Sequence, residues 1–120
     1  MKTKLRLTTL LIYLMSLTSF LNAADINNLK MLANQGDKEA QYNLGYCYEY
    51  GEGVGKDLRE AVSWYTRAAY QGDKNAQYNL GKCYYYGRGV VVDMREAVNW
   101  YTKAANQGHE YAKKIGRAHV

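Results

Sequence analysis

The feature that most constrains this chain is an internal repeat with a period of 36 residues. Residues 36–71 and residues 72–107 are identical at 26 of 36 positions and align without a gap. Both flanks keep the period, because residues 33–36 and residues 105–108 share the sequence Ala-Asn-Gln-Gly. A fixed period of this length is typical of a solenoid, in which each unit buries its apolar face only against its neighbours. The 120 residues therefore predict a single domain of stacked units.

Each unit is expected to form two helices. In the first helix, apolar residues recur at i, i+4, i+7 and i+8 and form one stripe; these are Ala40, Leu44, Cys47 and Tyr48. The second helix has a matching stripe, which consists of Ala61, Trp64, Tyr65 and Ala68. Asp57 and Glu60 have the spacing of an N-cap residue and its reciprocal partner, and Gly51 can adopt the left-handed conformation that ends a helix. The predicted fold class is all-α.

The small, aromatic and glycine residues of each unit follow a second, more specific pattern. In the first unit the pattern consists of Ala40, Leu44, Gly45, Tyr48, Gly51, Gly53, Val54, Asp57, Ala61, Trp64, Tyr65, Ala68, Ala69 and Gly72. The second unit carries it from Ala76 to Gly108. This pattern resembles the Sel1-like repeat, a close relative of the tetratricopeptide repeat (TPR). The resemblance implies a right-handed α-α solenoid of Sel1-like/TPR-like helix pairs. It also implies a scaffold for protein–protein interaction, since members mostly act as adaptors for protein complexes, in bacteria often in signalling or host contact.

The first 24 residues have the layout of a secretory signal peptide. Residues 1–6 are basic, and residues 7–21 form an apolar stretch that is shorter than the roughly 20 residues needed to span a bilayer. Small residues then precede the charged Asp25. We expect cleavage after Ala23, which gives a periplasmic or secreted bacterial protein with no stable membrane span. An uncleaved anchor is the alternative.

The period divides the remaining chain into units. Residues 24–35 are predicted to form the second helix of a half repeat, residues 36–71 and 72–107 are two complete repeats, and residues 108–114 begin a truncated third. Residues 115–120 break the pattern, because Gly116 stands where the complete units have Leu44 and Leu80. One choice of codons for these six residues matches a common sequencing adapter. Our hypothesis is that residues 115–120, including His119, form a non-native tail. An alternative function follows from this: the chain would be the N-terminal fragment of a longer repeat protein.

The charge of the chain does not indicate a nucleic-acid partner. Leaving out Lys2, Lys4, Arg6 and Arg117, which lie in the leader and the tail, lowers the 16 Lys+Arg to 12, against 11 Asp+Glu. A body this close to neutrality gives no excess of basic residues that would indicate phosphate binding. Two histidines and two cysteines also leave little material for a metal site, so no metal and no cofactor are predicted.

Tyrosines beside the core stripe of each first helix are the best candidates for a binding surface. They occupy positions i, i+3, i+7 and i+10, and the resemblance implies that this face lines a concave groove. The candidates are Glu39, Tyr42, Tyr46 and Glu49 in the first unit, and Asn75, Tyr78, Lys82 and Tyr85 in the second. Tyrosine offers a large amphipathic contact area at modest entropic cost, which suits a groove for an unidentified peptide or protein segment. The alternative is that these rings only cover neighbouring helices.

The two cysteines, Cys47 and Cys83, occupy the same position in successive units. Equivalent helices stack at about 8–10 Å, whereas the Cα atoms of a disulfide lie within roughly 7 Å of each other. We therefore predict two buried free thiols and no disulfide. A cysteine-rich branch of the Sel1-like family places its cysteines near the ends of neighbouring helices, and this sequence lacks that pattern.

An enzymatic role is the alternative from another class. Some members of the cysteine-rich branch resemble penicillin-binding or β-lactamase-like proteins. Serine catalysis of that kind uses Ser-x-x-Lys together with Ser-Asp-Asn and Lys-Thr-Gly, and none of these motifs occurs here. The sequence therefore predicts no catalytic residues.

Overall fold

The computed structural model describes residues 25–118. A helical segment at residues 25–34 is followed by α2 (Lys38–Tyr50), α3 (Leu58–Tyr70), α4 (Lys74–Tyr86), α5 (Met94–Asn106) and α6 (Glu110–Ala118). Because these described residues are helical and contain no strand, the all-α prediction is confirmed. The predicted signal peptide, residues 1–23, lies outside the described residues.

Side-chain caps explain where the helices begin and end. Oδ1 of Asp37 accepts a hydrogen bond from the backbone N–H of Ala40 at 2.8 Å, at the start of α2. Oδ1 of Asp57 accepts from the backbone N–H of Glu60 at 3.1 Å, so the predicted N-cap of α3 is confirmed. At the other end of α2, Gly51 has a φ of 70°, which is the left-handed conformation expected of a helix C-cap. These caps therefore account for both ends of α2 and for the start of α3.

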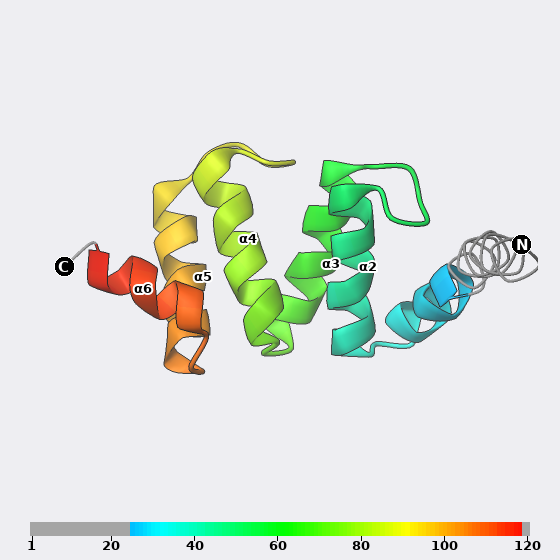
Figure 1. Ribbon diagram of the computed structural model, residues 1–120, viewed down its shortest axis with the longest axis horizontal. Coiled ribbons are helices and arrows are strands. Elements are labelled where there is room, and N and C mark those ends of the chain that lie inside the picture. Colours follow the sequence, from blue (N-terminus) through cyan, green and yellow to red (C-terminus); the bar gives the residue numbers. More distant parts are fainter. Residues whose placement is uncertain (1–24, 119–120) are drawn as a thin grey trace, which may run out of the picture.

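The helices stack in chain order. α2 packs against α3, α3 against α4, α4 against α5, and α5 against α6. Figure 1 shows the pairs following one another from α2 and α3 at the right to α5 and α6 at the left. Since each helix contacts its sequence neighbours, the molecule is an α-α solenoid, as the sequence predicts.

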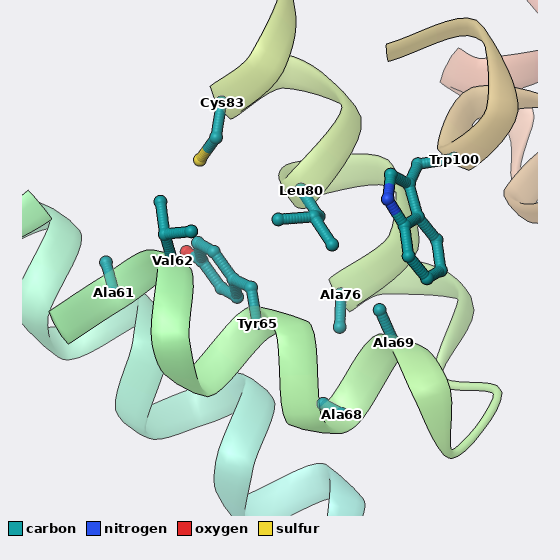
Figure 2. Close-up of a cluster of buried hydrophobic side chains, with 9 residues drawn as sticks. All are labelled: Ala61, Val62, Tyr65, Ala68, Ala69, Ala76, Leu80, Cys83 and Trp100. Atoms are coloured by element: carbon teal, nitrogen blue, oxygen red, sulfur yellow. The ribbon is translucent and has the colours of Figure 1, made fainter. Parts of the chain in front are cut away.

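The largest core cluster lies between α3, α4 and α5 (Figure 2). Tyr65 of α3 and Leu80 of α4 are 0% and 1% exposed. Val62 and Cys83 point toward each other across the same cluster, and Trp100 of α5 lies on its far side. Full burial of a leucine contributes about 1.5–3 kcal/mol, so these contacts across the boundary between units are what hold neighbouring repeats together.

Buried glutamines add polar links between the units. Gln41 is 4% exposed and donates from Nε2 to the carbonyl oxygen of Ala33 at 3.0 Å. Its Oε1 accepts a hydrogen bond from Nε2 of Gln71 at 2.7 Å. Gln77 occupies the same position in the next unit, and its Oε1 accepts from Gln107 at 2.8 Å. The bond from Gln41 satisfies the carbonyl of Ala33 at the end of its helix, and the glutamine pairs satisfy side-chain amides that are buried away from water.

The helix α6 extends to Ala118, past residue 114, and the predicted bounds of the third unit stay a prediction. Ala112 of α6 is 1% exposed, and the residues at the same position of the complete units, Ala40 and Ala76, are 4% and 0% exposed. The origin of residues 115–120 as adapter sequence stays a prediction. Between residues 25 and 118, no helix has both the length and the apolar character needed to cross a membrane.

Buried thiol and phenol groups are expected to make the fold less stable at alkaline pH. Burial raises the pKa of the Cys83 thiol from 9.0 to about 12, and burial together with a hydrogen bond to Glu49 raises the pKa of Tyr65 well above its usual 10.0. The unfolded chain therefore loses these protons first as the pH rises. Stability that is fully present below about pH 9 is lost toward pH 12, with a slope of about 1.4 kcal/mol per pH unit for each group. Urea unfolding at several pH values measures this slope, and a Cys83→Ala variant should have a shallower one. A stability that stays constant above pH 9 would contradict the burial of these protons.

Candidate binding face

The first helices of the units, α2, α4 and α6, place tyrosines on one face of the array. We call this the tyrosine face; it consists of Tyr42, Tyr46 and Tyr50 of α2, Tyr78, Lys82 and Tyr86 of α4, and Tyr111 of α6. Side chains four residues apart lie along one side of a helix, which aligns the three rings of α2. The ring centroids of Tyr46 and Tyr50 are 4.6 Å apart, and those of Tyr78 and Tyr111 are 6.0 Å apart. The rings therefore form contacts within and between helices.

Part of the tyrosine face is anchored and part is open. Tyr42 and Tyr78 are half-buried, and their ring centroids lie 5.9 Å from Tyr65 and 5.7 Å from Tyr101, the buried tyrosines of the second helices. The outer rings are more exposed: Tyr46 at 38%, Tyr50 at 50%, Tyr86 at 64% and Tyr111 at 62%. An anchored inner row therefore supports an outer row that is accessible to a partner.

Most of the residues predicted from the sequence lie on or beside this face. Tyr42, Tyr46, Tyr78 and Lys82 belong to it, and Nζ of Lys82 lies 5.6 Å from the centroid of the Tyr78 ring. Glu39 and Asn75 are exposed in the first turns of α2 and α4. The spacing i, i+3 and i+7 therefore selects residues that lie together in the structure, and their role in binding stays a prediction.

The last predicted position in each helix, i+10, needs correction. Glu49 is 3% exposed and is hydrogen bonded to Tyr65 in the second helix of its own unit. Tyr85, the equivalent residue, contacts Tyr101 and lines a cavity beside α5 and α6. In α2, position i+10 lies about 20° from the half-buried position i+3, whereas position i+11 lies about 40° from the exposed position i+7 and on its outer side. The tyrosine face therefore continues through the exposed i+11 residues, Tyr50 and Tyr86, which the sequence alone leaves unassigned.

Glu49 instead forms a buried polar contact between units. Its Oε2 accepts a hydrogen bond from the Tyr65 hydroxyl at 2.5 Å. Its Oε1 lies 3.4 Å from a terminal nitrogen of Arg88, which belongs to the loop between α4 and α5. The Glu49 side chain is 4% exposed, whereas that of Arg88 is 36% exposed. The Glu49 carboxylate therefore connects α2 with α3 and with the loop between α4 and α5.

A cavity of about 430 Å³ opens between α2 and α4 at the end of the tyrosine face. Its lining consists of Glu49, Tyr50, Lys82, Tyr86 and Arg88. Burial raises the pKa of Tyr50, and the nearby Glu49 carboxylate raises it further, so its hydroxyl keeps its proton. The cavity thus combines two cations, one carboxylate that already has partners, and two phenols.

The two thiols have different surroundings. Both cysteines are free in the structure. Cys83 is buried in the main core, as predicted, but Cys47 is only half-buried. A cavity of about 520 Å³ lies beside Cys47 and is lined in part by Ile26 and Leu29 of the segment 25–34. The prediction that no disulfide forms stays a prediction.

The side chains of the tyrosine face and its surroundings are of the kind that makes contacts with a partner. Across the described part of the chain, no three His, Cys, Asp or Glu side chains gather in a way that could hold a metal ion. Ser63 is exposed on α3 and precedes Trp64, Tyr65 and Thr66, with no lysine in the position that would activate it. Partly exposed aromatic rings with cations beside them are instead typical of protein-binding surfaces.

Comparison with known proteins gives the family. Residues 38–73 and 74–109 each match the Sel1 repeat model. The solved Sel1 repeat protein of Oxalobacter formigenes is 49% identical, with a TM-score of 0.71 over 72% of this chain and 65% of that one. Cysteine rich protein B of Helicobacter pylori is 33% identical, with a TM-score of 0.71 over 75% of this chain and 68% of that one.

The secretory immunoglobulin A-binding protein EsiB of Escherichia coli is 49% identical over 40% of this chain, which corresponds to 10% of its own length. The chain covers between 5% and 10% of the curated relatives that it matches. Sel1 repeat proteins generally mediate protein–protein interaction and are generally non-enzymatic scaffolds. Two matched repeats and the helical solenoid that they form place this chain in the Sel1 repeat family.

Proposed function

We propose that this protein is an exported interaction module that binds a peptide or an extended protein segment on the tyrosine face. The observation that carries the proposal is the row of partly exposed rings, Tyr46, Tyr50 and Tyr86, beside a cavity between α2 and α4. Tyrosine rings held by a rigid helical scaffold bury much area on binding and lose little side-chain entropy. A protein partner also agrees with the general role of Sel1 repeats.

Export is the second part of the proposal and rests on the sequence of residues 1–23. Their basic start, apolar stretch and small residues before Asp25 support secretion. The E. coli relative is named for binding secretory immunoglobulin A, so a related repeat protein has an extracellular protein as its partner. An extended segment on the outer rings is the form of partner that the surface of this chain fits best.

The test removes rings that contribute to the face but not to the core. A Tyr46→Ala/Tyr86→Ala double variant should bind peptides selected by the wild-type protein from a random library about tenfold or more weakly, because interface tyrosines are frequent hot spots. Fluorescence anisotropy with labelled peptides measures the affinity, and circular dichroism should show unchanged helicity. Tyr70→Ala is the matched control, since Tyr70 is 74% exposed but lies on α3, a second helix. An equal loss of affinity in the control variant would argue against the tyrosine face.

A further inference from the structure

We propose that the cavity between α2 and α4 binds a carboxylate side chain of the bound peptide, so that the protein selects an acidic residue at one position. This inference rests on the proposed function and names the chemistry of its partner. The cavity is lined by Glu49, Tyr50, Lys82, Tyr86 and Arg88. Its charges and its unused donors support an acidic ligand, and the change of residue types between the two described units supports a fixed register.

The charge of the cavity favours an anion. Glu49 is the one acidic residue in the lining, and its two oxygens are already engaged by Tyr65 and Arg88. Lys82 is half-buried, and its ammonium group lies over the ring of Tyr78 rather than against a carboxylate. The lining therefore carries two positive charges and one negative charge.

Hydrogen-bond donors are also left over. Arg88 contacts Glu49 through one terminal nitrogen of its guanidinium, and its side chain is 36% exposed. A guanidinium has five N–H donors, so one carboxylate does not exhaust it. Tyr50 and Tyr86 add hydroxyl donors at the exposed rim of the cavity. A carboxylate, which accepts several hydrogen bonds from donors of this kind, matches this set better than a neutral side chain does.

Between residues 25 and 118, this lining is described at the junction of α2 and α4. In the 36-residue period, Lys82 corresponds to Tyr46, Arg88 to Glu52, and Tyr85 to Glu49. The tyrosines recur from unit to unit, but this combination of two cations and a paired carboxylate does not. Recurring aromatic contacts alone would let a peptide slide by one repeat, whereas a single charged cavity fixes its register.

The test compares peptides and variants that differ by one charge. Peptides are selected on the wild-type protein from a random library, and selected sequences are expected to share an Asp or Glu at one position. Each is then resynthesised with the amide, Asn or Gln, at that position. The amide should weaken binding to the wild-type protein about tenfold, because charge-assisted hydrogen bonds are lost, but should have little effect on a Lys82→Gln variant. Lys103→Gln is the matched control, because Lys103 lies over Trp100 on α5, away from the cavity.

The outcomes separate this inference from the function on which it rests. Selection of no peptide that depends on Tyr46 and Tyr86 overturns the proposed function. Selection of peptides that depend on these rings but show no acidic preference overturns the carboxylate site alone. An acidic preference that persists in the Lys82→Gln variant also overturns it. Lys82 is half-buried at the rim rather than in the core, so the variant is expected to fold, and circular dichroism checks this.

Discussion

Replacing Gly81 by alanine should destabilise the fold, even though alanine is the better helix former. A Cβ atom at Gly81 would lie 2.8 Å from Cδ1 of the Tyr101 ring. Tyr101 is 7% exposed and lies in α5, which packs against α4, so the ring has little room to move away. Overpacking of this kind costs typically about 1–3 kcal/mol, whereas alanine gains roughly 0.8–1.0 kcal/mol over glycine in a helix. We expect a net loss of stability in urea unfolding.

A second substitution shows whether the ring is the cause. In a Gly81→Ala/Tyr101→Leu double variant, the smaller leucine leaves space for the new methyl group. The double variant should therefore be more stable than the sum of the two single changes predicts, by about 0.5–3 kcal/mol for residues in contact. Gly45 repeats this geometry, because a Cβ there would lie 2.7 Å from the Tyr65 ring. If Gly81→Ala is as stable as the wild type, the two helices are not in contact through this glycine.

Most of the fold could be predicted because its determinants are local and occur twice. The 36-residue period, the aspartate at the start of α3 and the glycine after α2 each act within a few residues of their own position. Tyr65 and Leu80 could be assigned to the core because apolar stripes on helices that stack must face each other. The close approach at Gly81 was not predicted, since a glycine in a helix gives no direct sign of which ring lies above it.

The binding face could be predicted only in part. The positions i, i+3 and i+7 select neighbouring side chains of α2, but the last position falls on Glu49, which is buried, whereas the neighbouring Tyr50 is exposed. Helical geometry alone does not separate the two residues, because i+10 lies about 20° from i+3 and i+11 lies about 40° from i+7; only their burial in the structure does. The partner of Glu49 could not be found in this way. Arg88 lies in another unit, and neither residue is repeated: Glu49 corresponds to Tyr85 and Arg88 to Glu52 in the 36-residue period. Only the packing of the units therefore brings Glu49 and Arg88 together.

Replacing Arg88 by methionine should be the most destabilising change in the tyrosine face and its surroundings. Methionine keeps much of the apolar length of the side chain but removes the charge that lies 3.4 Å from Glu49. The Glu49 side chain, 4% exposed, would then retain only the Tyr65 hydroxyl as a partner. Removing one partner of a buried ion pair leaves an uncompensated charge. We expect a loss of about 3 kcal/mol, at the lower end of the range for such pairs because Arg88 is itself partly exposed.

Neutralising Glu49 in the same variant distinguishes the stranded charge from a loss of packing. In an Arg88→Met/Glu49→Gln variant, the amide oxygen still accepts the hydrogen bond from Tyr65, and no buried charge remains. About half or more of the lost stability should return, because removing both partners of a buried pair costs far less than removing one. Arg95→Met is the matched control: Arg95 is exposed on α5, and surface substitutions usually change stability by about 0.5 kcal/mol or less. If Glu49→Gln recovers nothing, Arg88 stabilises the junction by packing, and the carboxylate is not what joins the two units.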